Sequence, residues 1–586
     1  MTHRHNSVTR SPYNQQMTDS RFQSTVDQSL KVNQLPEQRG SGGNHKRLMT
    51  TMTAASMLSL AALGITGCQP ADNVSDKESA TESAASEQQA DSGRTQVIEE
   101  LAGVPISQLI EFDPQEVKQG GDTGLSITSA ESYSKPSSNI PASRKGDFFI
   151  GNAFFKQPWV VAPASTDSRD GLGALFNVAA CQSCHIKDGR GHAPLDANDN
   201  ADSLLIRLAM PASTDAQKAQ LAASKIEKVA HPMYGGQLQD RGVEGVPAEA
   251  KIAVSWQDVP VTFADGHVVT LRRPNFKLTQ PGYGEFDPEL MLSPRVALPM
   301  IGLGLLEYIP DQAIINQAKA NQAKADSKKS GNNSTGVRGK YNWVIDPETG
   351  KQALGRFGWK AGQTRLITQN MSAFNEDMGL TSRIKPVESC TKLQTACLDA
   401  ATGADNQGDG LAPVEVSDEV AKFVEFYTRN LAVPHRRNAQ DSLVLAGKKR
   451  FFDIGCQDCH TPRYQLPKGD DDHLEQHGQV IYPYTDLLLH DMGDDLADRT
   501  VAGKLPPKDA QVEYLATSYD WRTPALWGVG LAQAVDPQAT FLHDGRARTL
   551  MEAVLWHGGE AESHKQQVLK LDKKGREELQ AFLNSL

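Results

Sequence analysis

Two short motifs contain the residues most able to bind a redox cofactor. The pattern C-x-x-C-H occurs twice, as Cys181, Cys184 and His185 and as Cys456, Cys459 and His460. Two thiols three residues apart on one helical turn can form thioethers with the two vinyl groups of a haem. The histidine after the second cysteine then lies under the iron as its proximal ligand. The sequence therefore predicts two covalently bound haem c groups.

Cysteine pairs can also bind zinc or act as redox pairs, and these alternatives require different neighbouring residues. Two C-x-x-C pairs can assemble a zinc site, and a thioredoxin-like redox pair has the same spacing. Neither needs a histidine after each pair, and neither pair here lies in a βαβ context. Cys390 and Cys397 in "CTKLQTAC" have no adjacent histidine, so a local disulfide is the preferred interpretation for them.

The N-terminal region has the features of an export signal. Lys46 and Arg47 precede a short apolar run that ends in "ITGC" at Cys68. A basic flank, an apolar core and small residues before a cysteine resemble a bacterial lipoprotein signal. We therefore predict that residues 1–67 are removed and that Cys68 is lipidated. A transmembrane anchor is the alternative, although the run is short and rich in Thr, Ser and Gly.

The predicted signal also indicates where the protein works. Residues 68–97 are rich in Ser, Glu, Ala and Gln, a composition that predicts a flexible tether. We expect the protein in the periplasm, held by its lipid at the outer membrane. This placement agrees with the haem motifs, because c-type haems are attached outside the cytoplasm.

Length and composition describe an ordinary soluble globular chain. Its 586 residues are enough for two or more domains with buried cores. The chain is 39% hydrophobic and 22% charged, and its formal net charge is −11. A negative charge of this size argues against nucleic acid as a partner.

The elements around the two motifs predict a mainly α protein with two cytochrome c-like haem domains. Apolar residues at helical spacing enter the second motif from residue 443 and recur in residues 564–586. By contrast, "KIAVSWQDVPVTFADGHVVTLRRPNF" alternates like two strands around the Asp265-Gly266 turn. We therefore predict a first haem domain at residues 98–430, with a partly β insertion at about 205–345, and a second haem domain at 431–586.

Several further stretches resemble one family of bacterial redox proteins. These are "RDGLGALFN", "YGGQLQDRG", "SPRVALPMIGLGLLE", "GRFGWKAGQTRL", "PYTDLLLHDMG" and "LHDGRARTL". They are similar to segments of the di-haem oxidoreductases that are often called thiol oxidoreductases. The C-terminal run from Asp520 also resembles the end of the related di-haem cytochrome c peroxidases. The resemblance covers roughly residues 145 to 586 and implies oxidoreductase activity.

The resemblance to the peroxidases implies a sixth ligand for the second haem. In that family a helix after a His-x-Gly segment carries the ligand, and the matching position, counted from His543, is His557. With His460 it would give a bis-histidine iron, which suits electron storage. Met492 in "LLLHDMGDD" is the alternative ligand, and His490 in the same stretch is expected to orient the haem surroundings.

The stretch "GRFGWKAGQTRLITQNMSAFNEDMG", residues 355–379, is similar to the distal side of the first haem in these peroxidases. The number of residues between Trp359 and Gln369 is the same as in that family. Asp377 stands where the family has a glutamate, but it lies two residues closer along the chain. The resemblance implies that Asp377 or Glu376 moves the peroxide protons. It also implies that Gln369 hydrogen-bonds the bound oxygen and that Trp359 passes electrons between the haems.

Departures from the family leave other interpretations open. Lys360-Ala361-Gly362 replaces the Asp-Gly-Arg that follows the tryptophan in the peroxidases. Asp377 is shorter and shifted, so it could instead cap or solvate a helix end while Trp359 packs in a core. Further candidates for the distal pocket are Gln237, Gln239 and Arg272.

The motifs and the resemblance together imply a peroxidase-like di-haem c-type cytochrome oxidoreductase. The second haem would take electrons from a donor cytochrome or another redox protein, and the first would reduce peroxide or another oxidant. Calcium, common between the haems of the peroxidases, is a further candidate cofactor. The alternative function is a pure electron carrier with both irons saturated. Dithiol chemistry at the C-x-x-C pairs is disfavoured by the adjacent histidines.

Overall fold

Strands are spread along the described chain and are not confined to the predicted insertion. The computed structural model describes residues 109–166, 168–195, 199, 202–327, 336–404, 413–469 and 473–586. These residues are 32% helical and 17% strand, so the prediction of a mainly α protein was wrong. The predicted export signal, the tether and Cys68 lie outside the described residues. Within the described part, no helix is long and apolar enough to span a bilayer.

The strands that the sequence did not predict are short and pair with distant partners. β11 (Leu489–Asp491) pairs with β15 (Asp520–Arg522), and β12 (Arg499–Thr500) pairs with β6 (Met291–Val296). A segment of two or three residues is too short to show a period-two alternation, so it carries no strand signal. Tertiary pairing therefore creates strands inside the region that was predicted to be a helical second haem domain.

The other strands form small antiparallel sheets. They are β1 (Leu175–Phe176) with β3 (Arg241–Gly242), β2 (Leu204–Ala209) with β6, β4 (Lys251–Thr262) with β5 (Val268–Thr279), β7 (Trp343–Ile345) with β8 (Gln352–Leu354), β9 (Tyr464–Gln465) with β10 (Val480–Ile481), and β13 (Gln511–Glu513) with β14 (Ala516–Thr517). Since β6 pairs with both β2 and β12, it joins the middle of the chain to the C-terminal part.

Helices precede, separate and follow these strands along the chain. The α-helices are α3 (Pro114–Val117), α4 (Lys145–Lys156), α5 (Cys181–Cys184), α6 (Asp215–Ala222), α7 (Leu303–Glu307), α8 (Asp311–Ser327), α9 (Leu366–Met378), α10 (Thr395–Leu398), α11 (Asp418–Arg429), α12 (Ser442–Ile454), α13 (Ala532–Val535), α14 (Leu550–Leu555), α15 (Glu562–Val568) and α16 (Lys573–Ser585). The 3-10 turns are η1 (Gly121–Thr123), η2 (Ala142–Arg144), η3 (Ile186–Asp188), η5 (Cys456–Asp458), η6 (Leu474–Gln476), η7 (Val529–Leu531) and η8 (Gly559–Ala561).

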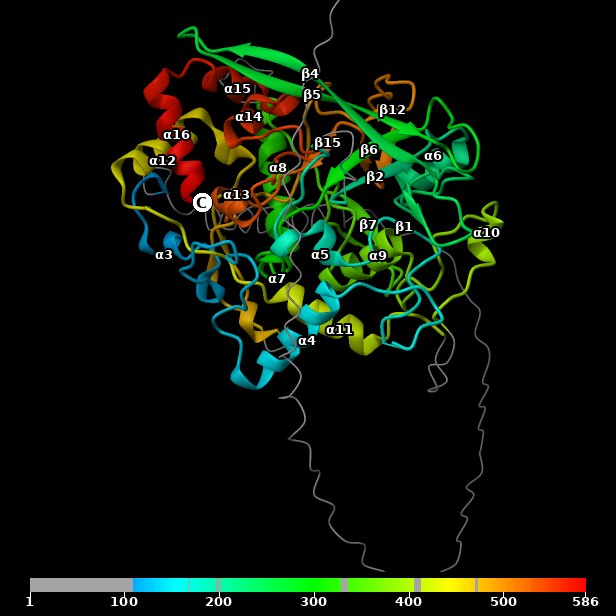
Figure 1. Ribbon diagram of the computed structural model, residues 1–586. Helices are drawn as coiled ribbons and strands as arrows, with labels where there is room; N and C mark the ends of the chain where they lie inside the picture. The colour runs from blue at the N-terminus through cyan, green and yellow to red at the C-terminus, as the bar shows by residue number, and fades with distance from the viewer. Residues whose placement is uncertain are drawn as a thin grey trace, which may run out of the picture. The chain divides into compact units, whose positions relative to one another are not determined.

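The predicted hairpin around Asp265-Gly266 is present as β4 and β5. The two strands pair in unbroken register from Lys251↔Thr279 to Thr262↔Val268. In Figure 1 this long green ribbon crosses the top of the molecule. Its tip residue Phe263 belongs to the C-terminal core and its base packs on the core of β2, so the hairpin joins two hydrophobic clusters. Apolar burial on the inner face stabilises it.

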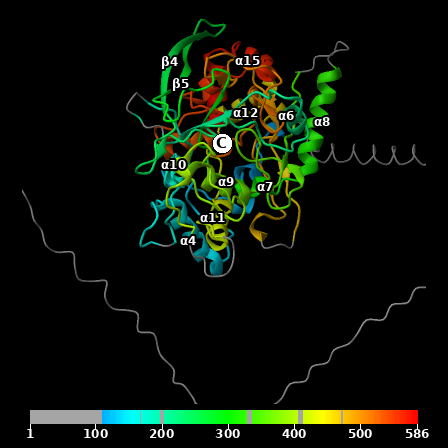
Figure 2. The ribbon, with the colours of Figure 1, turned by 90° about the vertical axis from the view of Figure 1, so that its right-hand side faces the viewer.

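Helices α12 and α16, both predicted from apolar spacing, pack directly on each other beside the second motif (Figure 1). Gly447 allows the close approach, because a Cβ at this position would lie 1.8 Å from the Glu578 carbonyl oxygen. At the opposite side of the described chain, α11 packs on both α4 and α9 (Figures 1 and 2). These two helix groups form the walls behind the two motifs.

A buried ion cluster fixes the N-terminal segment to the second motif region. Glu116 of α3 is 2% exposed and binds Arg436 at 2.6 Å, together with the Lys448 ammonium and the Tyr484 hydroxyl. One carboxylate thus forms ion pairs with two buried cations. Such clusters are costly to break, because removing one partner leaves charge in a medium of low polarity.

We predict that Glu116→Ala lowers the free energy of unfolding by about 3–5 kcal/mol, since two buried cations lose their counter-charge. Urea denaturation followed by circular dichroism measures this change. Asp453→Ala is the matched control, because Asp453 and Lys449 form an exposed pair four residues apart on a helix. It should change the unfolding free energy by no more than about 0.5 kcal/mol. Equal effects of the two substitutions would contradict this account of the cluster.

Candidate haem sites

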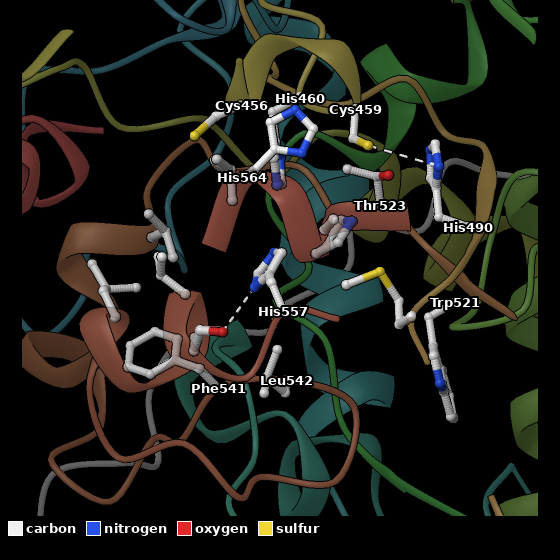
Figure 3. A pocket seen from close by; sticks show the side chains of 18 of the residues that line it. Cys456, Cys459, His460, His490, Trp521, Thr523, Phe541, Leu542, His557 and His564 are labelled. Atoms are coloured by element: carbon white, nitrogen blue, oxygen red, sulfur yellow. Dashed lines mark hydrogen bonds between the residues drawn. The ribbon is translucent and has the colours of Figure 1, made fainter. Parts of the chain in front are cut away.

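The second C-x-x-C-H motif opens into a cavity that is lined by residues from several segments of the chain. Cys456, Cys459 and His460 line it, and His557 and Met492 also reach it. Figure 3 shows the rings of His460 and His557 entering from different segments of the chain. Most of the remaining wall is apolar, which suits a macrocycle held by a few polar contacts.

A glycine sets the turn into this motif. Helix α12 ends at Gly455, whose φ of 96° lies in the left-handed region that favours glycine. The chain then passes into η5, and the His460 amide donates to the Cys456 carbonyl oxygen at 2.9 Å. This single turn brings the two thiols and the imidazole of the motif to one end of the helix.

His460 and His557 each use Nδ1 for a backbone hydrogen bond. His460 Nδ1 lies 3.0 Å from the Tyr484 carbonyl oxygen, and His557 Nδ1 lies 2.8 Å from that of Ala553. An imidazole that donates from Nδ1 presents a bare Nε2, which is the usual arrangement of a metal-binding histidine. Burial lowers the pKa of His460 to about 4, and burial also lowers the pKa of His557. Both rings are therefore neutral and able to bind a metal.

His490 lies in the same cavity wall but its ring nitrogens are occupied. Nδ1 is 2.8 Å from a Glu560 oxygen and Nε2 is 2.9 Å from an Asp486 oxygen. Although burial opposes charge, Cys459 and Asp486 raise the pKa of His490 well above its usual value. With both ring nitrogens bound, His490 cannot bind iron. The two sixth ligands that the sequence predicted, His557 and Met492, both remain candidates, and His543 and His564 also line this cavity.

The first motif is built in a similar way. Helix α5 contains Cys181 and Cys184, and the His185 amide donates to the Cys181 carbonyl oxygen at 3.0 Å. His185 Nδ1 lies 2.8 Å from the carbonyl oxygen of Leu298, so its Nε2 is again left for a ligand. Burial lowers the pKa of His185 to about 4 and keeps the ring neutral.

Asp377 lies close enough to this motif to influence its thiols. Burial raises the pKa of Cys181 to about 12, and the negative charge of Asp377 adds to the shift in both Cys181 and Cys184. Burial also raises the pKa of Asp377 itself to about 6. The Gln237 amide donates to Asp377 Oδ1 at 2.9 Å and fixes the carboxyl group. The structure thus places Asp377 and Gln237 together beside the first motif.

The backbone that follows β6 connects the first motif to the second cavity. The Trp359 indole Nε1 donates to the Val296 carbonyl oxygen at 2.8 Å, two residues before Leu298, which holds His185. The Val296 amide in turn donates to the His543 carbonyl oxygen at 2.7 Å. Trp359 and His543 both line the second cavity. Trp359 therefore joins the backbone beside the first motif to the wall of the second cavity.

Trp359 belongs to an aromatic cluster that the sequence did not indicate. The rings of Trp521 and His543 stack at 3.5 Å with an interplanar angle of 10°, and Trp359 meets Trp521 edge-on at 6.4 Å. The Lys360 ammonium lies 3.4 Å from the centre of the Trp521 ring. Trp359 and Lys360 precede Trp521 and His543 by 161 to 184 positions in the chain, so no local pattern could have linked the two pairs.

The predicted distal residues do not lie at one point. The side chain of Gln369 lies near Gly358, beside Trp359, whereas Asp377 lies beside the first motif. Both belong to α9, where eight residues correspond to about 12 Å along the axis. The side chain of Gln369 therefore lies beside Trp359, and that of Asp377 lies beside the cysteines of the first motif.

Glu376, the alternative proton carrier, has a different environment. It forms ion pairs with Arg207 and, at 3.8 Å, with Lys385. Although burial opposes it, the charge of Arg207 lowers the pKa of Glu376 to about 2. A carboxylate held in this way stays charged at neutral pH and is a poor proton carrier. Arg207 was not anticipated, because an arginine in a strand of six residues shows no motif.

The other predicted residues lie elsewhere. Gln239 donates to the Glu376 carbonyl oxygen at 2.8 Å, whereas Arg272 lies over the Trp256 ring and donates to the Gly545 carbonyl oxygen. Cys390 and Cys397 form a disulfide, as the sequence predicted.

The calcium ion that the resemblance made a candidate has no identified site among the described residues. In the part of the chain that the structure describes, no group of three or more His, Cys, Asp or Glu side chains is arranged to hold a metal ion.

Comparison with known proteins places the chain in one family. The family model described as "Di-haem oxidoreductase, putative peroxidase" matches residues 115–586, so the protein belongs to the di-haem oxidoreductases. A comparison with curated proteins gave no match. The matched residues include both C-x-x-C-H motifs, α9 and the aromatic cluster.

We predict that His557→Ala converts the second haem from low-spin to high-spin, because the bare Nε2 of His557 is lost from the cavity that also contains His460. Optical and electron paramagnetic resonance spectra of the ferric protein measure this change. Met492→Leu is the control of similar volume and should leave the low-spin signal unchanged. The reverse outcome, with loss of the low-spin signal only in Met492→Leu, would identify the methionine as the ligand.

Proposed function

We propose that this protein is a di-haem c-type cytochrome oxidoreductase with peroxidase-like chemistry at the first site. The observation that supports this most directly is the pairing of a neutral His185 with a nearby half-buried acid, Asp377, whose pKa is about 6. A group with a pKa near the working pH can both accept and return a proton. At the second motif the nearby carboxylates, Asp486 and Glu560, are both bound to the ring of His490.

The residues of both motifs fit a covalently bound haem. Each histidine donates from Nδ1 to a backbone carbonyl oxygen, and each cysteine pair lies on one turn of helix beside it. The four cysteines are free of disulfides, and their thiols are therefore available for thioether bonds. Bound haem iron would supply the redox chemistry that no side chain of this chain can provide.

The side chains around the first motif would manage the protons. Asp377 Oδ1 accepts a hydrogen bond from the Gln237 amide, which keeps the carboxyl group in one orientation. As a carboxylate, Asp377 accepts the proton of an incoming peroxide, and as a carboxylic acid it returns the proton to the departing oxygen. Arg207 adds a positive charge beside it, which opposes the increase of its pKa.

The side chains between the motifs would conduct the electrons. Trp359 is 6% exposed, is fixed by its indole hydrogen bond to Val296 and lines the second cavity. We propose that it lies on the route from the second site to the first. A bis-histidine second site of His460 and His557 would store the electron that a donor cytochrome or another redox protein delivers.

We also propose that the protein acts in the periplasm. Lipidation of Cys68 and the tether of residues 68–97 would hold the described part in the periplasm beside the outer membrane, where c-type haems and small redox partners occur. Metabolic labelling with a fatty acid, compared between the full chain and its Cys68→Ala variant, tests this part separately.

We predict that peroxide reduction falls as the pH decreases through about 6, because protonated Asp377 can no longer accept a proton. In Asp377→Asn this dependence disappears and kcat/KM falls by roughly 10² to 10⁴. Stopped-flow measurement of peroxide reduction between pH 5 and pH 8 (roughly the range over which such a group titrates) checks both statements.

Glu376→Gln is the control for this prediction. It removes the neighbouring carboxylate, which is held charged by Arg207, and should retain a fall in rate with decreasing pH. Because the charge of Glu376 contributes to the raised pKa of Asp377, the fall should move to a lower pH than in wild type. An Asp377→Asn protein that reduces peroxide at the wild-type rate would contradict the proposed role. It would favour the alternative of a pure electron carrier.

A further inference from the structure

Lys360 is a buried cation with no role in the proposed proton or electron steps. It is 0% exposed, and its ammonium forms an ion pair of 3.2 Å with Asp498, which is also 0% exposed. The ammonium donates to the Thr517 carbonyl oxygen at 3.1 Å and to that of Ser518 at 3.4 Å. Burying an ammonium carries a large desolvation penalty, so we looked for a function that this buried lysine could serve.

The ammonium is directed at one of two neighbouring tryptophans. It lies 3.4 Å from the centre of the Trp521 ring, whereas Trp359 meets Trp521 by its edge with ring centres 6.4 Å apart. The cation therefore acts most strongly on Trp521. Although burial lowers the pKa of Lys360 to about 8, the group remains mostly charged at neutral pH.

Either tryptophan would carry a positive charge after losing an electron. The Trp359 Nε1 donates to the Val296 carbonyl oxygen and the Trp521 Nε1 donates to the Leu496 carbonyl oxygen, both at 2.8 Å. A carbonyl oxygen is too weak a base to take the indole proton, so the oxidised ring stays a cation. An ammonium on the ring face stabilises the neutral indole and repels the oxidised one.

We propose that Lys360, paired with Asp498, keeps Trp521 reduced and thereby restricts one-electron oxidation in this cluster to Trp359. Stacking on His543 by itself would favour oxidation of Trp521, because a neutral imidazole face is electron-rich. The lysine opposes this effect. The proposal rests on the proposed electron route through Trp359, and it assigns Lys360 as a positioning residue that acts through the rings.

One-electron photo-oxidation tests this without peroxide. Flash-generated ruthenium(III) tris-bipyridine takes one electron from an indole and becomes ruthenium(II), and the indole proton stays on Nε1. Dioxygen in the aerated buffer then traps the radical as an oxygenated product. Peptide mass spectrometry of the diferric holoprotein measures the products at Trp359 and Trp521, with Trp527 as internal reference.

Two variants, compared with the wild type, separate the effect of charge from that of structure. In wild type and in Lys360→Arg, which keeps a cation at the ring, product should form mainly at Trp359. In the Lys360→Met, Asp498→Asn double variant, which removes both charges together, the ratio of Trp359 to Trp521 product should fall by about tenfold. The double variant avoids a lone buried carboxylate. A ratio that is unchanged in the double variant, or no product at either tryptophan in wild type, would overturn the proposal.

This test and that of the proposed function can fail independently. A protein that does not reduce peroxide still reports its tryptophan ratio under photo-oxidation. Conversely, a peroxidase whose ratio does not respond to Lys360 retains the proposed function and loses only this inference.

Discussion

The short backbone segment after β6 is the constraint on which both candidate sites depend. The Leu298 carbonyl oxygen holds His185, and the Val296 carbonyl oxygen holds Trp359. These acceptors are main-chain atoms of residues two positions apart, so peptide geometry limits the separation between the two groups that they hold. β6 is itself fixed on both edges by β2 and β12. Such a fixed interval would suit the electron transfer that we propose between the two sites.

Charge burial around the sites follows one pattern. Burial keeps His185, His460 and His557 neutral, and hydrogen bonds from Nδ1 to carbonyl oxygens orient their rings. Burial also raises the pKa of the acid–base group Asp377 to about 6. Several fixed charges lie in ion pairs, such as Glu116 with Arg436. This pairing matters, because a buried unpaired charge near a redox group would change its potential as well as the stability of the fold.

Local patterns in the sequence predicted the parts of the structure that depend on local interactions. The two motifs, the helix entering the second motif and the Asp265-Gly266 hairpin all depend on neighbours within a few positions. Family resemblance drew attention to Trp359 and Asp377, yet it could not show that Gln369 and Asp377 lie about two helical turns apart. The contact of Trp359 with Trp521 and the short strands β11, β12 and β15 arise from pairing between segments that are not neighbours in the sequence. Their residues carry no periodic signal, and for this reason the mainly α prediction was wrong.

The central claim is that the two sites differ, with one haem that can bind peroxide and one that is saturated. The electron paramagnetic resonance spectrum of the purified, fully oxidised wild-type protein tests it most directly. The account predicts one high-spin and one low-spin ferric signal, with only the high-spin signal changing when hydrogen peroxide is added. Two low-spin signals that are both unaffected by peroxide would contradict it.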